Sequence, residues 1–294
     1  MLDALKTWGK VLGIALLLAV PAPDNAAYRQ SVEQWRQSYE AKLKGDDGWL
    51  TVSGLFWLHE GQNTFGSGRD NDVILPAPLP AHAGYFDLHE GKTVVHVNAG
   101  VPITMAGKPV ETVELRPDSK TDRLKIGDLT FFVHENAGRY GIRLKDRNSV
   151  LRKKFTGLHW FPVNESYRVM AHFVPYSSPR KTRIEIIDGN QDTTMITGYL
   201  EFQLAGKPYR LEAEHDDDTN GLFIVFRDLT SRKETYPAAR FLDADSPKDG
   251  AVELDFNKAY NPPCAYNPYA TCPLPTPGNR LQIAVPAGEK RYHD

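Results

Sequence analysis

The chain has 294 residues, and its 35 Lys and Arg against 37 Asp and Glu give a formal net charge of −2 at pH 7. This balance lacks the clustered positive charge with which proteins bind nucleic acid, so we expect no nucleic-acid partner. Hydrophobic residues make up 41% of the chain and charged residues 24%, which excludes a disordered protein and predicts a packed core.

The first 27 residues are typical of an export signal. Lys6 and Lys10 precede an apolar run from Val11 to Val20, which Pro21 ends. A run of about ten residues is shorter than the roughly 20 that span a bilayer as a helix. We therefore interpret residues 1–27 as a signal peptide and expect a periplasmic or secreted protein. An uncleaved membrane anchor is the alternative, and it would be the chain's only link to a membrane.

Cys264 and Cys272 are the only cysteines of the chain. An oxidising compartment favours a disulfide between them, and closing so short a loop would stabilise the fold by about 2.5 kcal/mol. Two alternatives remain, a thiol nucleophile and a zinc pair, although zinc would need a second Cys or His pair at suitable spacing.

Residues 28–44 are predicted to form an amphipathic helix. Val32, Trp35, Tyr39 and Leu43 recur at helical spacing among charged and polar residues. The segment 45–48, Gly-Asp-Asp-Gly, is expected to end this helix.

From Trp49 onward the pattern is that of short strands. Apolar or alternating runs are separated by Gly, Pro, Asn and Asp, and they lie at residues 49–58, 72–75, 84–88, 93–97, 110–115, 129–134, 140–144, 167–175, 182–187, 193–204, 209–215 and 222–227. Gly206-Lys207 and Asn220-Gly221 are predicted hairpin turns. We expect a mainly β protein in four parts: signal peptide (1–27), helix (28–48), β-sandwich (49–147) and a second antiparallel sheet or barrel (148–294), with the boundary in the basic segment 148–157.

Several motifs resemble the bacterial family called domain of unknown function 1684. They are Gly48-Trp49-Leu50, Gly54-Leu55-Phe56-Trp57-Leu58, Gly157-Leu158-His159-Trp160-Phe161-Pro162 and the run Asp255-Phe256-Asn257-Lys258-Ala259-Tyr260-Asn261-Pro262-Pro263-Cys264, which continues through Cys272-Pro273 to Ala287-Gly288-Glu289. The resemblance covers nearly the whole chain after the signal, and it implies no particular activity.

Residues 60–135 resemble a forkhead-associated (FHA) β-sandwich. Gly68-Arg69 matches the Gly-Arg turn of that family, and His82 matches its His. The phosphothreonine-contacting Ser of the family falls on Leu79, and its later Asn falls on Ala106. The resemblance therefore implies the sandwich, but without two phosphate donors we do not expect phosphopeptide binding.

The segment His215 to Gly221 begins like a calcium loop. Position twelve of such a loop needs a bidentate Glu, and here it is Arg227. A polar hairpin whose Asn220-Gly221 supplies positive φ is the preferred interpretation, so we expect no metal. No fingerprint of a nucleotide or other cofactor is present, and none is expected.

Residues 255–279 contain six prolines together with Asn257, Asn261 and Asn279. Because proline lacks a backbone donor, this segment is expected to be an ordered, non-repetitive loop that closes the second β domain. Such a loop serves either as a structural plug or as a preformed binding surface. Arg240 could bind a carboxylate or phosphate, or it could pair with Asp243, Asp245 or Asp255.

The sequence shows no recognised catalytic motif, so it leaves open whether the protein is an enzyme. We expect an exported protein that binds a small or extended ligand in the second β domain, with Arg240, Asp255, Asn257, Asn261 and Asn279 as candidate contacts. One alternative is an envelope hydrolase for an ester or carbohydrate substrate that uses an acid–base pair from Asp243, Asp255 and Glu289 in the same pocket. Another is a structural partner of the cell envelope that docks through Trp49, Phe56 and Trp57.

Overall fold

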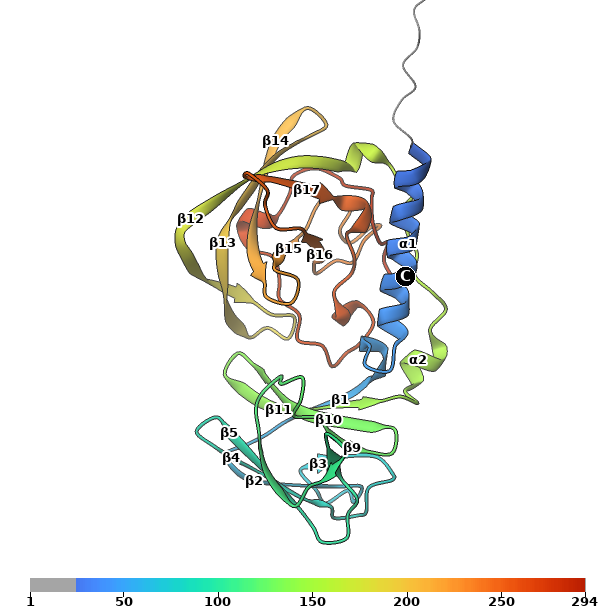
Figure 1. Cartoon of the computed structure of the whole chain (residues 1–294), viewed down its shortest axis with the longest axis vertical. Helices are drawn as coiled ribbons and strands as arrows, with labels where there is room; N and C mark the ends of the chain where they lie inside the picture. Colours follow the sequence, from blue (N-terminus) through green and yellow to red (C-terminus); the bar gives the residue numbers. More distant parts are fainter. Residues whose placement is uncertain (1–24, 294) are drawn as a thin grey trace, which may run out of the picture.

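The structure is a computed structural model that describes residues 25–293 (Figure 1). It is mainly β with one long N-terminal helix, which confirms the predicted fold class. Nearly all of the predicted signal peptide, residues 1–24, lies outside the described part of the chain. Within the described part, none of the helices has the length and apolar character that a membrane crossing requires.

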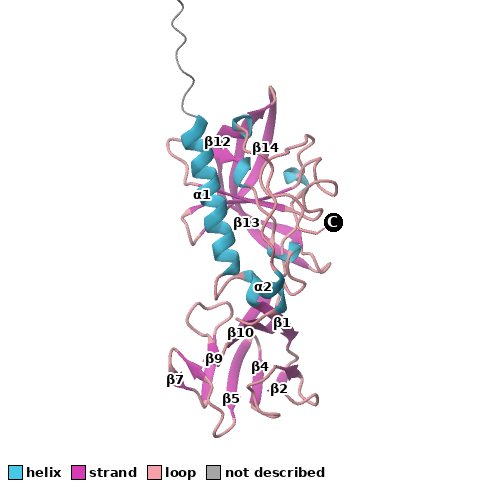
Figure 2. Ribbon diagram, turned by 90° about the vertical axis from the view of Figure 1, so that its right-hand side faces the viewer, coloured by secondary structure: helices cyan, strands magenta, loops and turns pink. Residues whose placement is uncertain are grey.

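The helix α1 (Asn25–Lys44) begins three residues before its predicted start and ends where it was expected. Val32, Arg36 and Leu43 are its buried residues, one stripe of the helix. The helix lies along the second β region rather than the first (Figure 2). Trp35 and Tyr39, one turn apart, stack with 5.5 Å between ring centroids.

The first β region is a sandwich of two sheets that share one apolar core. One sheet has the order β1-β11-β10-β9-β6-β7 and the other β3-β2-β4-β5-β8. The strands of both are β1 (Val52–Trp57), β2 (Gly61–Gly66), β3 (Val73–Ile74), β4 (Gly84–His89), β5 (Lys92–Val97), β6 (Thr104–Met105), β7 (Lys108–Pro109), β8 (Thr112–Leu115), β9 (Leu124–Ile126), β10 (Leu129–Asn136) and β11 (Arg139–Asp146). Phe65 and Phe86 from one sheet pack against Phe131 from the other, at 6.1 and 6.4 Å between centroids.

The second β region is one strongly curved antiparallel sheet with the order β16-β15-β14-β13-β12-β17. Its strands are β12 (Arg168–Glu185), β13 (Gln191–Leu204), β14 (Lys207–Asp216), β15 (Gly221–Phe226), β16 (Arg240–Ala244) and β17 (Ala251–Asp255). The edge strands β16 and β17 contact each other, and the sheet curls into a half-barrel, which we call the barrel. Residues 148–157 connect the two regions and contain the short helix α2 (Val150–Lys154).

The proline-rich segment fills one side of this barrel. From Phe256 to His293 the described chain forms no strand, and its only regular elements are the 3-10 turns η3 (Phe256–Lys258), η4 (Pro263–Ala265) and η5 (Pro277–Asn279). Two more 3-10 turns, η1 (Trp49–Thr51) and η2 (Glu165–Tyr167), lie earlier in the chain. The expected non-repetitive loop is confirmed, and Leu281, Val285 and Ala287 join the barrel core.

Two details differ from the sequence prediction. The turn between β13 and β14 is Ala205-Gly206, with φ of 49° and 73°, one residue earlier than predicted. Leu204 and Lys207 are the last pair, so the two residues between them take the positive φ that a two-residue hairpin requires. The runs 167–175 and 182–187 join into one strand, β12, whose register against β13 shifts between Pro175 and Arg180.

Candidate functional site

Arg240 is fully buried, with none of its side chain exposed. Its Nη1 donates to Asp228 Oδ2 at 2.7 Å and to the carbonyl of Val285 at 3.1 Å, and its Nη2 donates to the carbonyl of Ala287. The predicted partners Asp243, Asp245 and Asp255 are therefore wrong. The cause is strand pairing: Phe226 of β15 lies opposite Arg240, which places Asp228 beside it.

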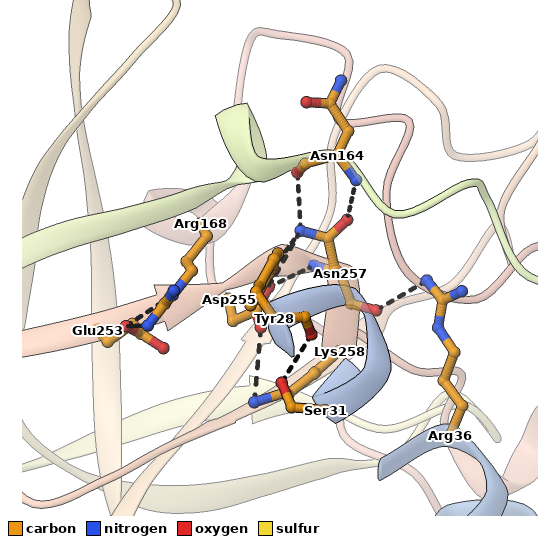
Figure 3. A network of polar contacts seen from close by, with 9 residues as sticks. All are labelled: Tyr28, Ser31, Arg36, Asn164, Arg168, Glu253, Asp255, Asn257 and Lys258. Atoms are coloured by element: carbon orange, nitrogen blue, oxygen red, sulfur yellow. Dashed lines mark hydrogen bonds and ion pairs between the residues drawn. The ribbon is translucent and has the colours of Figure 1, made fainter. Parts of the chain in front are cut away.

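Asp255 and Asn257 lie together where β17 ends, under the first turn of α1 (Figure 3). The amide of Asn257 donates to the Tyr28 hydroxyl and the Asn164 carbonyl, each at 2.9 Å, and its Oδ1 accepts from the Asn164 N–H. Tyr28 in turn donates to Asp255 Oδ1 at 2.8 Å. Arg36 donates to the carbonyl of Asn257 at 3.2 Å, so this network fastens α1 to the barrel.

Asn261 holds the carboxylate of Glu289, which is 1% exposed. The backbone N–H and the side-chain amide of Asn261 donate to the two carboxylate oxygens at 2.8 Å each, and the Tyr266 hydroxyl donates to one of them. Burial raises the pKa of Glu289 to about 8 in spite of these donors. Because the Glu289 carboxyl group is enclosed, it has no access to a substrate in its predicted role as a general acid or base.

Asn279 fills a gap between two strands. β14 and β15 pair only at Glu214–Asp216 with Gly221–Phe223, and beyond this point they separate. The Asn279 side chain there accepts from the Glu212 N–H at 2.7 Å and donates to the carbonyls of Glu212 and Val225, at 2.9 Å each. Its amide thus replaces the missing strand partner.

The structure brings two of the five predicted site residues together, Asp255 and Asn257, and places the other three in separate hydrogen-bond networks. All five are buried, between 0 and 5% exposed. Their polar groups bind other parts of the chain, so each supports the loop around it. A ligand contact by these residues stays a prediction.

A groove of about 1200 Å³ opens beside Asn279, on the side of the barrel formed by β12, β13 and β14. Five lining residues belong to the barrel core or pack against it: Val169, Ala171, Phe202, Tyr209 and Leu281. Polar and exposed side chains also line it: Met170, His172, Glu201, Gln203, Arg210, Asp249, Arg280 and Gln282. The combination can hold an apolar molecule that carries polar groups.

Sequence reasoning missed this groove because its lining comes from five separate segments. The only sequence signal for the groove was the position of Arg280, directly after the predicted Asn279. Arg280 lines the groove, whereas Asn279 fills the gap between β14 and β15.

A chain of polar contacts links the sandwich to the barrel. His134 of β10 lies 2.9 Å through Nδ1 from Asp118 Oδ1 and 2.9 Å through Nε2 from the Thr271 hydroxyl. Arg143 donates to the same hydroxyl at 3.3 Å. Carboxylate, imidazole and hydroxyl in this order can activate a hydroxyl nucleophile. None of these residues lines the groove, however, and His134 is only 7% exposed, so we interpret the chain as an interdomain link.

The two cysteines are neighbours but do not form the predicted disulfide in this structure. Both are free thiols, and the Cys264 N–H lies 3.2 Å from Cys272 Sγ. η4 turns the chain back on itself here, which brings the two residues together.

The predicted calcium-like segment and the predicted docking residues belong to ordinary elements of the fold. The segment His215 to Gly221 forms the β14–β15 hairpin, with Asn220 at φ 57°. Among residues 25–293, no group of three or more His, Cys, Asp or Glu side chains could hold a metal ion. Trp49 and Phe56 pack against apolar cores, whereas Trp57 is 36% exposed under the guanidinium of Arg139.

Two positions of the sandwich correspond to phosphate contacts in FHA domains, and one of them is exposed whereas the other is buried. Arg69 is exposed on a turn. Leu79, which stands in place of the contacting Ser, is 4% exposed and packs in the sandwich core. This position therefore contributes to packing.

One comparison with known proteins, a family model, matches the second β region. The sequence model of a family described as "Protein of unknown function (DUF1684)" matches residues 153–290. A solution NMR structure of an uncharacterized protein from Haloarcula marismortui is 34% identical, with 47% of this chain and 78% of that chain covered and a TM-score of 0.40. The family match is narrower than the nearly whole chain expected, since residues 48–58 fall outside it. A search of the curated proteins found no match.

Solved FHA domains are also similar to part of the chain. One comes from a study of phosphothreonine-dependent FHA interactions, and the other is the FhaA FHA domain in complex with an intracellular domain. They are 16% and 18% identical, cover 31% of this chain and 92% and 97% of their own, and each has a TM-score of 0.22.

Proposed function

We propose, for a chain that belongs to the DUF1684 family over residues 153–290, that it binds a small or extended ligand in the groove of its barrel. The observation that carries this proposal is the groove itself, about 1200 Å³ in volume and lined by both apolar and polar side chains. Ligand sites typically have volumes of roughly 300–1000 Å³ and combine an apolar lining with a few polar groups. We therefore place the proposed site beside the predicted Asn279, whose neighbours Gly278 and Arg280 line the groove, and not at the buried Arg240 and Asn261.

Two exposed methionines provide a matched test. Met170 lines the groove and is 62% exposed, whereas Met195 lies on β13 outside the groove lining and is 49% exposed. Because neither side chain belongs to the core, Met170→Glu and Met195→Glu are both expected to fold. Thermal unfolding against metals, sugars, nucleotides and acyl esters would find ligands, since a ligand of the folded state raises Tm.

We expect a shift in Tm that Met170→Glu removes and Met195→Glu keeps. A shift unaffected by either variant would place the ligand elsewhere, and no shift with any compound would count against binding. The hydrolase alternative predicts that an ester which binds is also cleaved, so product analysis of the same samples separates the two functions.

We further propose that the protein is exported and that Cys264 and Cys272 form a disulfide after export. The signal-like residues 1–27 support export, and the contact of the Cys264 N–H with Cys272 Sγ, which makes the two residues neighbours, supports closure of the bond. N-terminal sequencing of exported protein should begin between residues 21 and 29, while a start at Met1 would favour an anchor. Two free thiols in the unfolded, non-reduced protein would contradict the disulfide.

A further inference from the structure

Arg227 and Arg280 lie side by side at the edge of the groove, and Arg232 is near enough for its charge to act on Arg227. Arg227 and Arg280 face each other in a parallel β-bridge, in which the Arg227 N–H donates to the Asn279 carbonyl at 2.9 Å and the Leu281 N–H to the Arg227 carbonyl at 2.8 Å. Arg280 is exposed and lines the groove. The bridge thus fixes the backbone of two cations side by side at the edge of the candidate site.

Among the described residues, no carboxylate neutralises these three arginines, although they lie near one another. Within residues 25–293, the three guanidinium groups take part in no ion pair, hydrogen bond or aromatic stack. Other arginines are paired with carboxylates, namely Arg36, Arg116, Arg139, Arg147, Arg152, Arg168 and Arg240. Four more lie over aromatic rings: Arg123, Arg143, Arg180 and Arg210.

The cluster is electrostatically unfavourable as it stands. Burial lowers the pKa of Arg227, and the positive charges of Arg280 and Arg232 lower it further. Like charges this close are normally separated or neutralised, because their repulsion destabilises the folded chain. A bound anion would remove the repulsion, and guanidinium groups are well suited to bind phosphate or carboxylate through two parallel hydrogen bonds.

We propose that this edge of the groove binds an oxyanion, a phosphate or carboxylate, as the head group of an amphiphilic ligand whose apolar part lies over Val169, Tyr209 and Leu281. The inference rests on the proposed function, and it names the chemical class of the ligand. Glu201 and Asp249 also line the groove and repel an anion, so the head group belongs beside Arg280 and not at their positions. The apolar residues next to Arg280 then receive the chain.

Calorimetric titration with four probes, below their critical micelle concentrations, tests this assignment. Dodecyl phosphate and laurate carry an oxyanion and a chain, dodecyl maltoside carries the chain alone, and inorganic phosphate carries the anion alone. We expect dodecyl phosphate or laurate to bind more tightly than the neutral amphiphile, and their affinity to fall as salt is added. Saturable binding of inorganic phosphate that is lost in Arg280→Gln would instead support a free anion, and not the head group of an amphiphile, as the ligand of this site.

Arg280→Gln should weaken binding of the anionic amphiphiles by roughly tenfold, the effect of losing one charged hydrogen bond. Arg183→Gln is the matched control, because Arg183 is an exposed arginine of β12 that does not line the groove. Both replaced side chains are exposed, so circular dichroism should show both variants folded.

The outcomes separate the two proposals. If dodecyl maltoside binds as tightly as dodecyl phosphate and Arg280→Gln changes neither, the oxyanion site is wrong, while loss of maltoside binding in Met170→Glu would still support the groove. If no anionic probe binds, or if Arg183→Gln weakens binding as much as Arg280→Gln, the assignment of the oxyanion to Arg280 is also wrong.

Discussion

The sandwich and the barrel of this protein are stabilised in different ways. In the sandwich, two sheets face each other and bury a continuous apolar core that includes Phe65, Phe86 and Phe131. The barrel has an apolar core too, but buried charges and amides surround it: Asp228, Arg240, Asp255, Asn257, Asn261, Asn267, Asn279 and Glu289. The difference follows from the proline-rich segment, which cannot form ladder hydrogen bonds and so leaves backbone groups for side chains to satisfy.

The largest effect is expected at the buried ion pair of the barrel. Arg240→Met leaves the Asp228 carboxylate buried without its partner, so the free energy of unfolding should fall by about 3–5 kcal/mol. The matched control is Arg168→Met, which breaks the exposed pair of Arg168 with Glu253 and should cost about 0–1 kcal/mol. Urea unfolding of both variants measures the two losses in the free energy of unfolding. Equal losses would contradict the expected difference between the buried and the exposed ion pair.

The second prediction concerns pH. Glu289 has a pKa of about 8 in the folded protein, above its ordinary value, so the folded state binds the proton more tightly than the unfolded state. Stability contributed by the protonated group is therefore complete at low pH and is lost as the pH rises from about 4.5 toward 8, by on the order of a few kcal/mol. Unfolding measured across this range should give a slope that Glu289→Gln flattens. An unchanged slope would mean that another group titrates.

The third prediction uses the two thiols of the barrel loop. Oxidation of Cys264 and Cys272 should raise the free energy of unfolding by about 2.5 kcal/mol, because the bond restricts the unfolded chain. The measurement is urea unfolding with and without reductant. The double variant Cys264→Ser with Cys272→Ser should not respond to reductant, and a response there would point to a different cause.

The smallest effect is expected at an unpaired buried hydroxyl of the sandwich. The Thr93 hydroxyl is buried and has no hydrogen-bond partner. Thr93→Val keeps the shape and removes that group, so stability should stay the same or rise by about 1 kcal/mol. Asn279→Ala in the barrel should instead destabilise, because it leaves the Glu212 N–H and two carbonyls unpaired. Thermal unfolding of the two variants compares the regions directly, and a loss in Thr93→Val would contradict this view.

The strand pattern of the fold could be predicted from the sequence, because alternation and turn residues are local signals. Strands β4, β5, β10, β11, β13, β14 and β15 were expected at nearly their observed positions. β2, with the sequence GQNTFG, was missed because it contains little apolar alternation. β16 and β17 were missed because the polar residues around them suggested a binding loop.

The candidate site was less predictable, for a physical reason. Asn257, Asn261 and Asn279 were singled out because polar residues among prolines are typical of binding loops, and Arg240 because its planar guanidinium suits a carboxylate or phosphate. In the structure all four side chains donate to backbone carbonyls of other segments, those of Asn164, Val225, Val285 and Lys290. The composition of a loop cannot separate these two roles, since both need the same amides and charges. The groove depends instead on which strands become neighbours.

The contacts that residues near the two ends of the described chain make with the barrel have a consequence for folding kinetics. Tyr28 and Arg36 near the start bind Asp255 and Asn257, while the carbonyls of Val285 and Ala287 near the end accept from Arg240. The Tyr28–Asp255 contact spans 227 residues of sequence, and the contacts of Arg240 span 45 and 47. Folding dominated by such distant contacts is slow. The barrel should therefore stay incomplete, with its core open to proteases and to other chains, until residues 255–287 are available to it.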